Sequence, residues 1–260
     1  MLTSKLQFTF LGTGTSQGVP VIGCHCPVCT SDDPRDNRLR TAGMVSFQGT
    51  NIVIDTGPDF RQQMLREYVD DVTAILFTHD HNDHTVGLDD VRPLNFKHKK
   101  HMALYATPSV QRSLINRFGY AFGENAYPGA PRLVFETISK DHNFMIEGLE
   151  IQPIEVWHGE TLPILGFRFN DLTYITDCKS IQSEELEKIK GTKTLILNAL
   201  HHNEHKTHLN LKEALALIQR INPEQTYLIH ISHSMGKYED VQKTLPKNVA
   251  LAYDGMVIGD

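Results

Sequence analysis

Four candidate metal ligands lie close together in the stretch ILFTHDHNDHTVG (75–87). They are His79, His81, Asp83 and His84, in the pattern H-x-H-x-D-H that directly follows an apolar run. In an extended chain His79 and His81 project to the same side, because side chains alternate along a strand. Asp83 and His84 come after a bend near an expected helix start, where they can face a second point. If these imidazole and carboxylate groups were simply packed together, they would lack hydrogen-bond partners. The stretch therefore predicts a metal site.

Three further polar residues each follow an apolar run elsewhere in the chain. His158 ends IEVWH, Asp177 ends TYITD and His230 ends TYLIH. Each of them alone is explained as well by a polar residue at the end of a strand. Together with the first four they supply enough ligands for two catalytic metals, which in such sites lie about 3.5–4 Å apart. The whole set therefore predicts a two-metal hydrolytic centre.

A second group of candidate ligands is the C-x-C-x-x-C pattern in GCHCPVC (23–29). It contains Cys24, Cys26 and Cys29, and the chain has 4 cysteines in total. A disulfide framework spreads an even number of cysteines along a small chain, whereas clustered thiols are typical of metal sites. A closed structural zinc site has four ligands, so this group lacks one.

The stretch QTYLIHISHSMG (225–236) offers the missing ligand. On a continued strand His230 and His233 would point to opposite faces and could not serve one site. With His230 assigned to the two-metal centre, His233 is predicted to complete the cysteine site. His25 is the alternative, although it lies between two of the cysteines and would have to fold back.

The composition limits the classes of function. The 260 residues are 40% hydrophobic and 22% charged, which is ordinary for a globular protein. A net charge of −6 argues against a non-specific nucleic-acid binder. The basic cluster KHKK with His101 (97–101) is interpreted as solvated surface, with contact to an anionic substrate as the alternative. The N-terminal residues lack signal-peptide features and no apolar run approaches ~20 residues, so we expect a cytoplasmic protein without a membrane span.

Short apolar runs that favour strands recur along the chain between helical patterns: 6–11, 44–47, 52–54, 73–77, 149–156, 164–169, 172–175, 194–197, 226–229 and 250–253. Helices are expected in four segments, with a serine cap at Ser183 and an asparagine cap at Asn210: 58–68, 108–118, 183–190 and 210–221. The first two should bury one face each, formed by Phe60, Met64 and Leu65 and by Val110, Leu114 and Ile115. The early strands follow one another through short turns, which favours mixed sheets over one parallel sheet. We expect one α/β domain over residues 1–260.

The order H-x-H-x-D-H, then His158, Asp177 and His230, resembles the dinuclear members of the metallo-β-lactamase superfamily across nearly the whole chain. The resemblance implies an αββα four-layer sandwich, with two mixed sheets packed face to face and helices outside. It makes Asp55 in VIDTG (53–57) a supporting aspartate rather than a ligand. It also divides the ligands: His79, His81 and His158 for one metal, Asp83, His84 and His230 for the other, and Asp177 as the bridge.

Within that superfamily the cysteine pattern and HISH (230–233) resemble the branch typified by phosphoribosyl 1,2-cyclic phosphate phosphodiesterase. The branch implies His208, just before a late helix, as catalytic acid, and Asp177 is the second residue expected to be catalytic. It implies a phosphodiesterase that opens a small cyclic phosphate by attack of metal-bound hydroxide. Two manganese or zinc ions, one structural zinc, a small phosphorylated substrate and a homodimer are the expected cofactors and partners. Neither nucleic acid nor a membrane is an expected partner.

Other functions remain as alternatives. A transfer-RNA 3′-processing endonuclease shares the fold, but the acidic charge and the lack of a basic arm disfavour it. Thioester or lactam hydrolysis would fit the ligand Asp83, although it leaves the cysteine cluster and His208 unexplained. A non-enzymatic, metal-stabilised scaffold would be expected to lack ligands, and none is missing. Arg38 and Arg40 are expected at the surface, with contact to a second substrate phosphate as the alternative.

Overall fold

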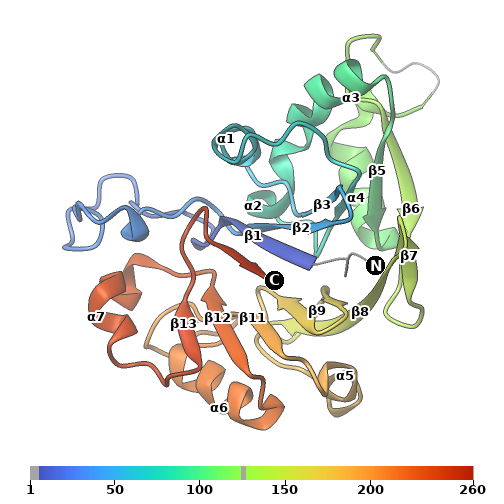
Figure 1. The fold of residues 1–260 in the computed structure, drawn as a ribbon. Helices are drawn as coiled ribbons and strands as arrows, with labels where there is room; N and C mark the ends of the chain where they lie inside the picture. The colour runs from blue at the N-terminus through green and yellow to red at the C-terminus, as the bar shows by residue number, and fades with distance from the viewer. Residues whose placement is uncertain (1–5, 124–126, 260) are drawn as a thin grey trace. The chain divides into compact units, whose positions relative to one another are not determined.

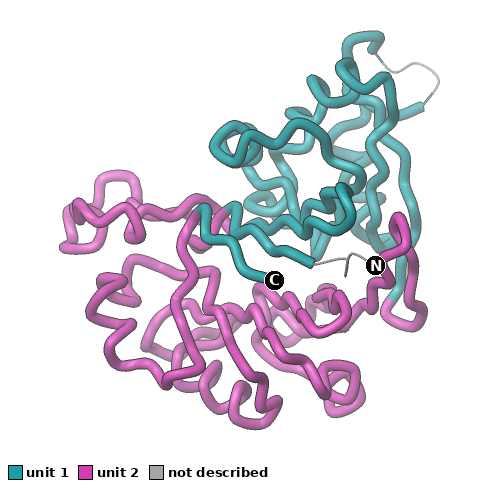
Figure 2. Tube along the Cα trace, viewed as in Figure 1, with its two compact units in different colours: residues 1–11, 42–139, 255–260 teal, residues 12–41, 140–254 magenta. Residues whose placement is uncertain are grey.

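The fold was examined in a computed structural model that describes residues 6–123 and 127–259. The chain divides into two compact units, each assembled from segments that are distant in sequence. Figure 2 shows unit 1, formed by residues 1–11, 42–139 and 255–260, and unit 2, formed by residues 12–41 and 140–254. Each unit contains its own sheet and its own hydrophobic core, and the expectation of a single domain stays a prediction.

Unit 1 is built on a seven-stranded sheet with the order β14-β1-β2-β3-β4-β5-β6. Strand β14 pairs antiparallel with β1 and β2 pairs antiparallel with β3, whereas the pairs β3–β4, β4–β5 and β5–β6 are parallel. Its strands are β1 Leu6–Gly12, β2 Ala42–Phe47, β3 Thr50–Ile54, β4 Ala74–Leu76, β5 Met102–Ala106, β6 Leu133–Thr137 and β14 Val257–Gly259.

Unit 2 is built on a second seven-stranded sheet with the order β13-β12-β11-β10-β9-β8-β7. The strands from β7 to β10 are antiparallel, and those from β10 to β13 are parallel. Its strands are β7 Phe144–Ile146, β8 Leu149–His158, β9 Leu162–Phe169, β10 Leu172–Ile175, β11 Thr194–Asn198, β12 Gln225–Ile229 and β13 Val249–Leu251. Both sheets are mixed, which confirms the prediction from the short turns.

Helices cover a face of each sheet (Figure 1). Those of unit 1 are α1 Phe60–Arg66, α2 Asn82–Thr85, η2 Val86–Val91, α3 Arg92–His98, α4 Pro108–Arg117 and η3 Gly119–Ala121. Those of unit 2 are η1 Pro34–Asp36, α5 Ser183–Ile189, α6 Leu211–Ile221, η4 His233–Met235 and α7 Tyr238–Gln242. The core of unit 2 forms where Ala214 and Ile218 of α6 pack on Leu197 and Leu228 of the sheet. The apolar face of each helix therefore fixes the sheet on which the candidate ligands stand.

The predicted helices are present, with two local errors. Asn210 caps α6 through a capping box with Glu213, as predicted, but the N-cap of α5 is Gln182 and not Ser183. Leu65 is 59% exposed and Ile115 is 43% exposed, whereas Met64 and Leu114 are buried. Because each helical residue is rotated by about 100° from the one before it, a narrow buried stripe includes Met64 or Leu114 and excludes the next residue.

Four strands lie outside the predicted apolar runs: β5, β6, β7 and β14. Strands β7 and β14 have 3 residues each, and β6 is partly or fully exposed along its length, so none of the three forms a long buried run. Strand β5 is held in the sheet by parallel pairing with β4, and this pairing joins two segments that are distant in sequence. In the ranges 6–123 and 127–259, no helix has both the length and the apolar composition needed to cross a bilayer.

Candidate functional site

The ligand stretch of unit 1 follows β4 and enters α2. His79 comes shortly after the strand, and His81 is the N-cap of α2. The ring centroid of His79 lies 4.6 Å from that of His81 and 4.3 Å from that of His84. The bend predicted before Asp83 is therefore present, and the three imidazoles gather at one place.

Asp55 organises two of these histidines. Its carboxylate accepts hydrogen bonds from His84 Nδ1 at 2.7 Å, from Thr78 Oγ1 at 2.8 Å and from the Thr78 backbone N–H at 2.9 Å. Since the Thr78 hydroxyl donates to Asp55, its lone pair accepts the hydrogen bond from His79 Nδ1 at 2.9 Å. In both rings Nδ1 then carries the proton, which leaves Nε2 as the nitrogen able to bind a metal.

Asp55 is fully buried, and burial raises the pKa of its carboxyl. His84 and Thr78, which donate hydrogen bonds to this carboxyl, oppose that rise. Asp55 has a φ of 65°, so the chain turns sharply after β3 and brings this side chain beside the end of β4. The supporting role that the sequence resemblance implied for Asp55 fits these contacts.

Two further residues of unit 1 hold the ligand stretch, and the sequence reasoning missed both. Arg117 in α4 donates to the Asp80 carbonyl at 2.8 Å and to Thr85 Oγ1 at 2.8 Å. Gly87 packs so closely that a Cβ there would lie 2.1 Å from the carbonyl oxygen of Gly57. The glycine permits the backbone after α2 to approach the loop after β3, which carries Asp55.

The candidate ligands of unit 2 lie at the ends of β8, β10 and β12. His158 is the last residue of β8, whereas Asp177 and His230 follow β10 and β12. His230 Nδ1 lies 3.2 Å from Asp177 Oδ1, and His208 Nε2 lies 3.2 Å from Asp177 Oδ2. The ring of His208 lies 4.7 Å from that of His158 and stacks at 4.8 Å on that of His230. The structure thus brings the predicted residues His158, Asp177, His208 and His230 into one cluster.

Parallel pairing explains the convergence at Asp177. Because β10, β11 and β12 run parallel and in register, their carboxyl ends meet at the same edge of the sheet. Asn198, at the end of β11, accepts from the Cys178 backbone N–H at 2.8 Å and donates to the Cys178 carbonyl at 3.0 Å. It fixes the backbone directly after Asp177. The apolar run TLILN ends in this asparagine, so the pattern that identified His158 and His230 could have found it.

Hydrogen bonds also orient the imidazoles of unit 2. His158 Nδ1 donates to the Thr207 carbonyl at 3.0 Å, which leaves Nε2 as its ligating nitrogen. His230 differs, because its Nε2 lies 3.3 Å from Thr15 Oγ1 and its Nδ1 faces Asp177. His230 is therefore suited to bind a metal through Nδ1.

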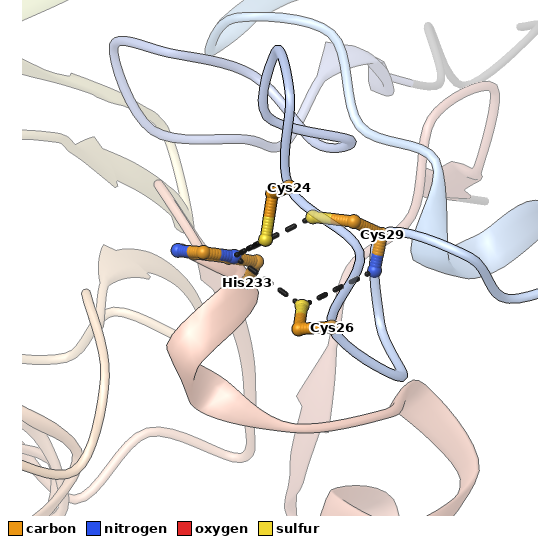
Figure 3. Close-up of side chains that lie close together, drawn as sticks. All are labelled: Cys24, Cys26, Cys29 and His233. Atoms are coloured by element: carbon orange, nitrogen blue, oxygen red, sulfur yellow. Dashed lines mark hydrogen bonds between the residues drawn. The ribbon is translucent and has the colours of Figure 1, made fainter.

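The predicted cysteine site is assembled within unit 2, as Figure 3 shows. His233 Nδ1 lies 3.3 Å from Cys24 Sγ, 3.4 Å from Cys26 Sγ and 3.4 Å from Cys29 Sγ. Three sulfurs and one nitrogen directed at a common point are the donor set of a closed zinc site. The prediction that His233 joins the cysteines is consistent with this geometry.

His230 and His233 are directed to different sites, as predicted, but for a different reason. Strand β12 ends at Ile229, so His230 and His233 are not separated by strand alternation. His230 instead has a φ of 56°, and His233 begins η4. The left-handed residue turns the chain, which directs His230 to Asp177 and His233 to the cysteines.

The thiols differ in acidity. The backbone N–H of Cys29 donates to Cys26 Sγ and lowers the pKa of Cys26 to about 6. Burial raises the pKa of Cys29 to about 11. Cys26 therefore supplies the thiolate that zinc requires more readily than Cys29. The remaining cysteine, Cys178, is fully buried, and burial raises its pKa beyond the usual range, which agrees with its interpretation as a packing residue.

The two arginines and the basic cluster have local partners. Arg38 is buried, contrary to its expected surface position, and its Nη1 donates to Thr13 Oγ1 at 2.8 Å and to the Ala252 carbonyl at 2.6 Å. Arg40 Nε donates to the Ser16 carbonyl at 3.2 Å. In the basic cluster, Lys97 pairs with Asp70 and Lys100 pairs with Asp71. These contacts favour structural roles for all four cations.

Comparison with known proteins agrees with this architecture. The beta-lactamase superfamily domain matches residues 50–231. The chain belongs to the metallo-β-lactamase superfamily. A crystal structure described as a new diphosphatase from the PhnP family is 39% identical and has a TM-score of 0.92, covering 98% of this chain and 97% of that one. That similarity places the chain in the PhnP family, and with its two mixed seven-stranded sheets it confirms the predicted fold class.

Two other relatives extend the comparison. The Zn²⁺-bound PqqB of Methylobacterium extorquens has a TM-score of 0.79 at 19% identity, over 97% of this chain and 99% of that one, and shares the fold. An octanoyltransferase of Porphyromonas gingivalis strain W83 is 39% identical over 96% of this chain but only 51% of its own length. The chain therefore spans about half the length of that curated relative.

Proposed function

We propose that the chain is a metal-dependent hydrolase that cleaves a P–O bond in a small phosphorylated substrate, with a phosphoribosyl-type cyclic phosphodiester as the preferred substrate. The observation that carries the proposal is the position of His208. Its Nε2 lies 3.2 Å from Asp177 Oδ2, in the same cluster as the candidate ligands His158 and His230. A proton donor among metal ligands is the arrangement that hydrolysis with a basic leaving group requires.

The donor types of the candidate ligands suit two divalent cations. We assign them as the superfamily pattern implies: His79, His81 and His158 to one cation, Asp83, His84 and His230 to the other, and Asp177 to both. The fit is supported by the tautomers, because the hydrogen bonds of His79, His84 and His158 leave Nε2 of each ring able to ligate. Mixed imidazole and carboxylate donors are compatible with manganese or zinc. When bound, such cations lower the pKa of a coordinated water and polarise a phosphoryl oxygen.

The residues of the chain then have separate tasks. Opening of a cyclic diester forms one P–O bond to the oxygen of water and breaks one P–O bond to the sugar. The departing alkoxide needs a proton, which His208 in its imidazolium form donates from Nε2, while Nδ1 keeps its own proton. Asp177 holds the cluster together, since its Oδ1 faces His230 and its Oδ2 faces His208. Thr176 Oγ1 donates to Asp177 Oδ1 at 2.6 Å and helps to fix the carboxylate.

A diphosphate is the second substrate class. The 39% identical crystal structure is described as a diphosphatase, and hydrolysis of a diphosphate also breaks a P–O bond. Octanoyl transfer is less well supported, because the match covers about half of that relative. Among the thiols of this chain, Cys178 is buried, and the other three belong to the cysteine cluster. The net charge of −6 also favours a small substrate over transfer RNA.

The test uses the purified protein loaded with manganese or zinc. After the reaction, the metal ions are removed from the sample and the products are identified by phosphorus NMR. The substrates are phosphoribosyl 1,2-cyclic phosphate, a 2′,3′-cyclic nucleotide and diadenosine diphosphate. Selective opening of the phosphoribosyl ring supports the proposal, and selective cleavage of the diphosphate replaces the substrate while keeping the reaction. If none is cleaved by protein that binds both cations, the proposed function is wrong.

A further inference from the structure

The segment 201–208 forms a polar loop that is pinned at both ends beside Asp177. The Leu200 N–H donates to the Leu209 carbonyl at 2.9 Å, and the Leu209 N–H donates to the Cys178 carbonyl at 2.8 Å. The two bonds fix the base of the loop to the backbone that follows Asp177. Two imidazoles of the loop, those of His205 and His208, are thereby brought together, with ring centroids 5.0 Å apart.

The hydrogen bonds of His205 determine which of its nitrogens carries the proton. The backbone N–H of Thr207 donates to His205 Nδ1 at 3.3 Å, so that nitrogen presents a lone pair. Burial first, and then the neighbouring His208 and His201, lower the pKa of His205 below its usual value. The Thr207 N–H thus makes Nδ1 the acceptor nitrogen of His205, and in the neutral ring the proton lies on Nε2.

That acceptor faces His208. His208 Nδ1 lies 3.2 Å from His205 Nδ1 and 2.9 Å from Thr207 Oγ1. Because Nδ1 of His205 is an acceptor, we assign Nδ1 of His208 as the donor of this contact, with Thr207 Oγ1 as its second acceptor. This bond fixes the rotation of the His208 ring about its side-chain axis and keeps Nε2 directed at Asp177 Oδ2.

We propose that His205 is a positioning residue, which accepts a hydrogen bond from His208 Nδ1 and so holds Nε2 in place for proton donation to the leaving group. This inference rests on the proposed function, in which His208 is the acid. A ring without that contact turns more freely and presents Nε2 less often. The loss should therefore grow with the basicity of the leaving group, because a weakly basic leaving group departs without a proton.

The kinetic test compares phosphodiesters with alkyl, phenyl and p-nitrophenyl leaving groups on the zinc-loaded protein. We expect His205→Ala to lower kcat by about 10–100-fold for the alkyl leaving group, and by less than about threefold for p-nitrophenol, with KM unchanged. His205→Asn should recover most of the rate, since Asn Oδ1 can take the place of Nδ1 as the acceptor. His205→Gln carries the same amide one carbon further out and should not recover it.

Thr207→Val separates this role from that of the neighbouring hydroxyl. The substitution keeps the backbone N–H that fixes the His205 tautomer and removes Oγ1, which lies within 3.2 Å of His205 Nδ1. We expect Thr207→Val to retain most of the rate for the alkyl leaving group. A loss in Thr207→Val equal to that in His205→Ala, without recovery by Asn, would assign the positioning to the hydroxyl and overturn the proposal.

A spectroscopic readout is independent of turnover. Two-bond ¹H–¹⁵N correlation spectra of the zinc-loaded protein identify the tautomer of each histidine ring. We expect His205 to show an unprotonated Nδ1 and His208 a protonated Nδ1, with the His208 signals changed in His205→Ala. A proton on His205 Nδ1, or an equal loss of rate for all leaving groups, contradicts the inference. If the wild-type protein cleaves no phosphodiester, the proposed function fails, while the spectra still decide whether the contact exists.

Discussion

Unit 2 contains two clusters of candidate metal ligands that differ in chemistry and in surroundings. Cys24, Cys26, Cys29 and His233 are partly buried and supply three sulfurs and one nitrogen to a single point. The cluster around Asp177 contains a carboxylate shared between two imidazoles, and its rings are oriented by hydroxyl and carbonyl groups. The first set is chemically complete with one ion, which suits a structural site. The second contains a carboxylate between two imidazoles and the proposed proton donor His208, which suits the proposed catalysis.

The largest effect is expected from substitution of Asp177, whose carboxylate lies between His208 and His230 in the second cluster. Asp177→Ala should lower kcat by at least about 1,000-fold, because it removes a shared ligand worth several kcal/mol to the transition state. The cysteine-site zinc should remain bound. Asp177→Asn is the matched variant, because asparagine tolerates the φ of 52° at this position. The measurements are turnover and metal content per chain, and loss of the cysteine-site zinc in Asp177→Asn would mean that the two clusters are not independent.

The converse substitution is His233→Ala in the first cluster. We expect the loss of about one zinc ion per chain and a lower Tm, because a three-thiolate site binds zinc less well than a complete one. His25→Ala is the control, since His25 is the alternative ligand in the same loop. Elemental analysis and thermal unfolding provide the readout. Full zinc content in His233→Ala, together with loss in His25→Ala, would reverse the assignment.

A smaller effect is expected from the groups that orient the histidines. Thr78→Val keeps the shape of the side chain but removes the hydroxyl that links His79 to Asp55. Loss of such a supporting contact typically lowers metal affinity or activity by about 10–100-fold. Thr226→Val is the matched control, because its buried hydroxyl has no hydrogen-bond partner among the described residues. Equal metal affinity in the two variants would show that the hydroxyl does not orient His79.

The smallest effect is expected away from both clusters, in the basic segment 97–101. Lys97→Met removes an exposed ion pair with Asp70, and exposed pairs contribute little to the free energy of unfolding because water and salt screen them. We expect a small loss of stability and an unchanged KM for the phosphorylated substrate. Chemical denaturation and steady-state kinetics measure the two quantities. A several-fold rise in KM would instead assign the segment to substrate binding.

The candidate ligands also differ in how directly the sequence predicted them. The spacing of H-x-H-x-D-H and C-x-C-x-x-C is local, so the donor types and their proximity were readable directly. The strand-end pattern identified His158, Asp177 and His230, because a polar residue after a buried run is visible in a single segment. The same pattern is present at Asn198 but has no metal-type side chain to draw attention to it.

Contacts between distant segments were not readable in this way. Thr78 supports His79 only because β3 and β4 pair in parallel, which places Asp55 beside the end of β4. His205 faces His208 because the ends of segment 201–208 are pinned to each other and to Cys178. The sequence contains several neighbouring histidines there, and nothing in their spacing distinguishes their roles.

The sequence by itself determined which donors are available, the α/β character and the mixed sheets, because side-chain chemistry and hydrophobic periodicity are properties of single segments. Tertiary structure decided which atom of each donor is presented and in which direction. His230 and His233 illustrate the difference. Their separation was predicted from strand alternation, yet it results from a left-handed backbone at His230. Backbone turns and hydrogen-bonded tautomers depend on partners supplied by the whole fold, and therefore only the folded chain fixes them.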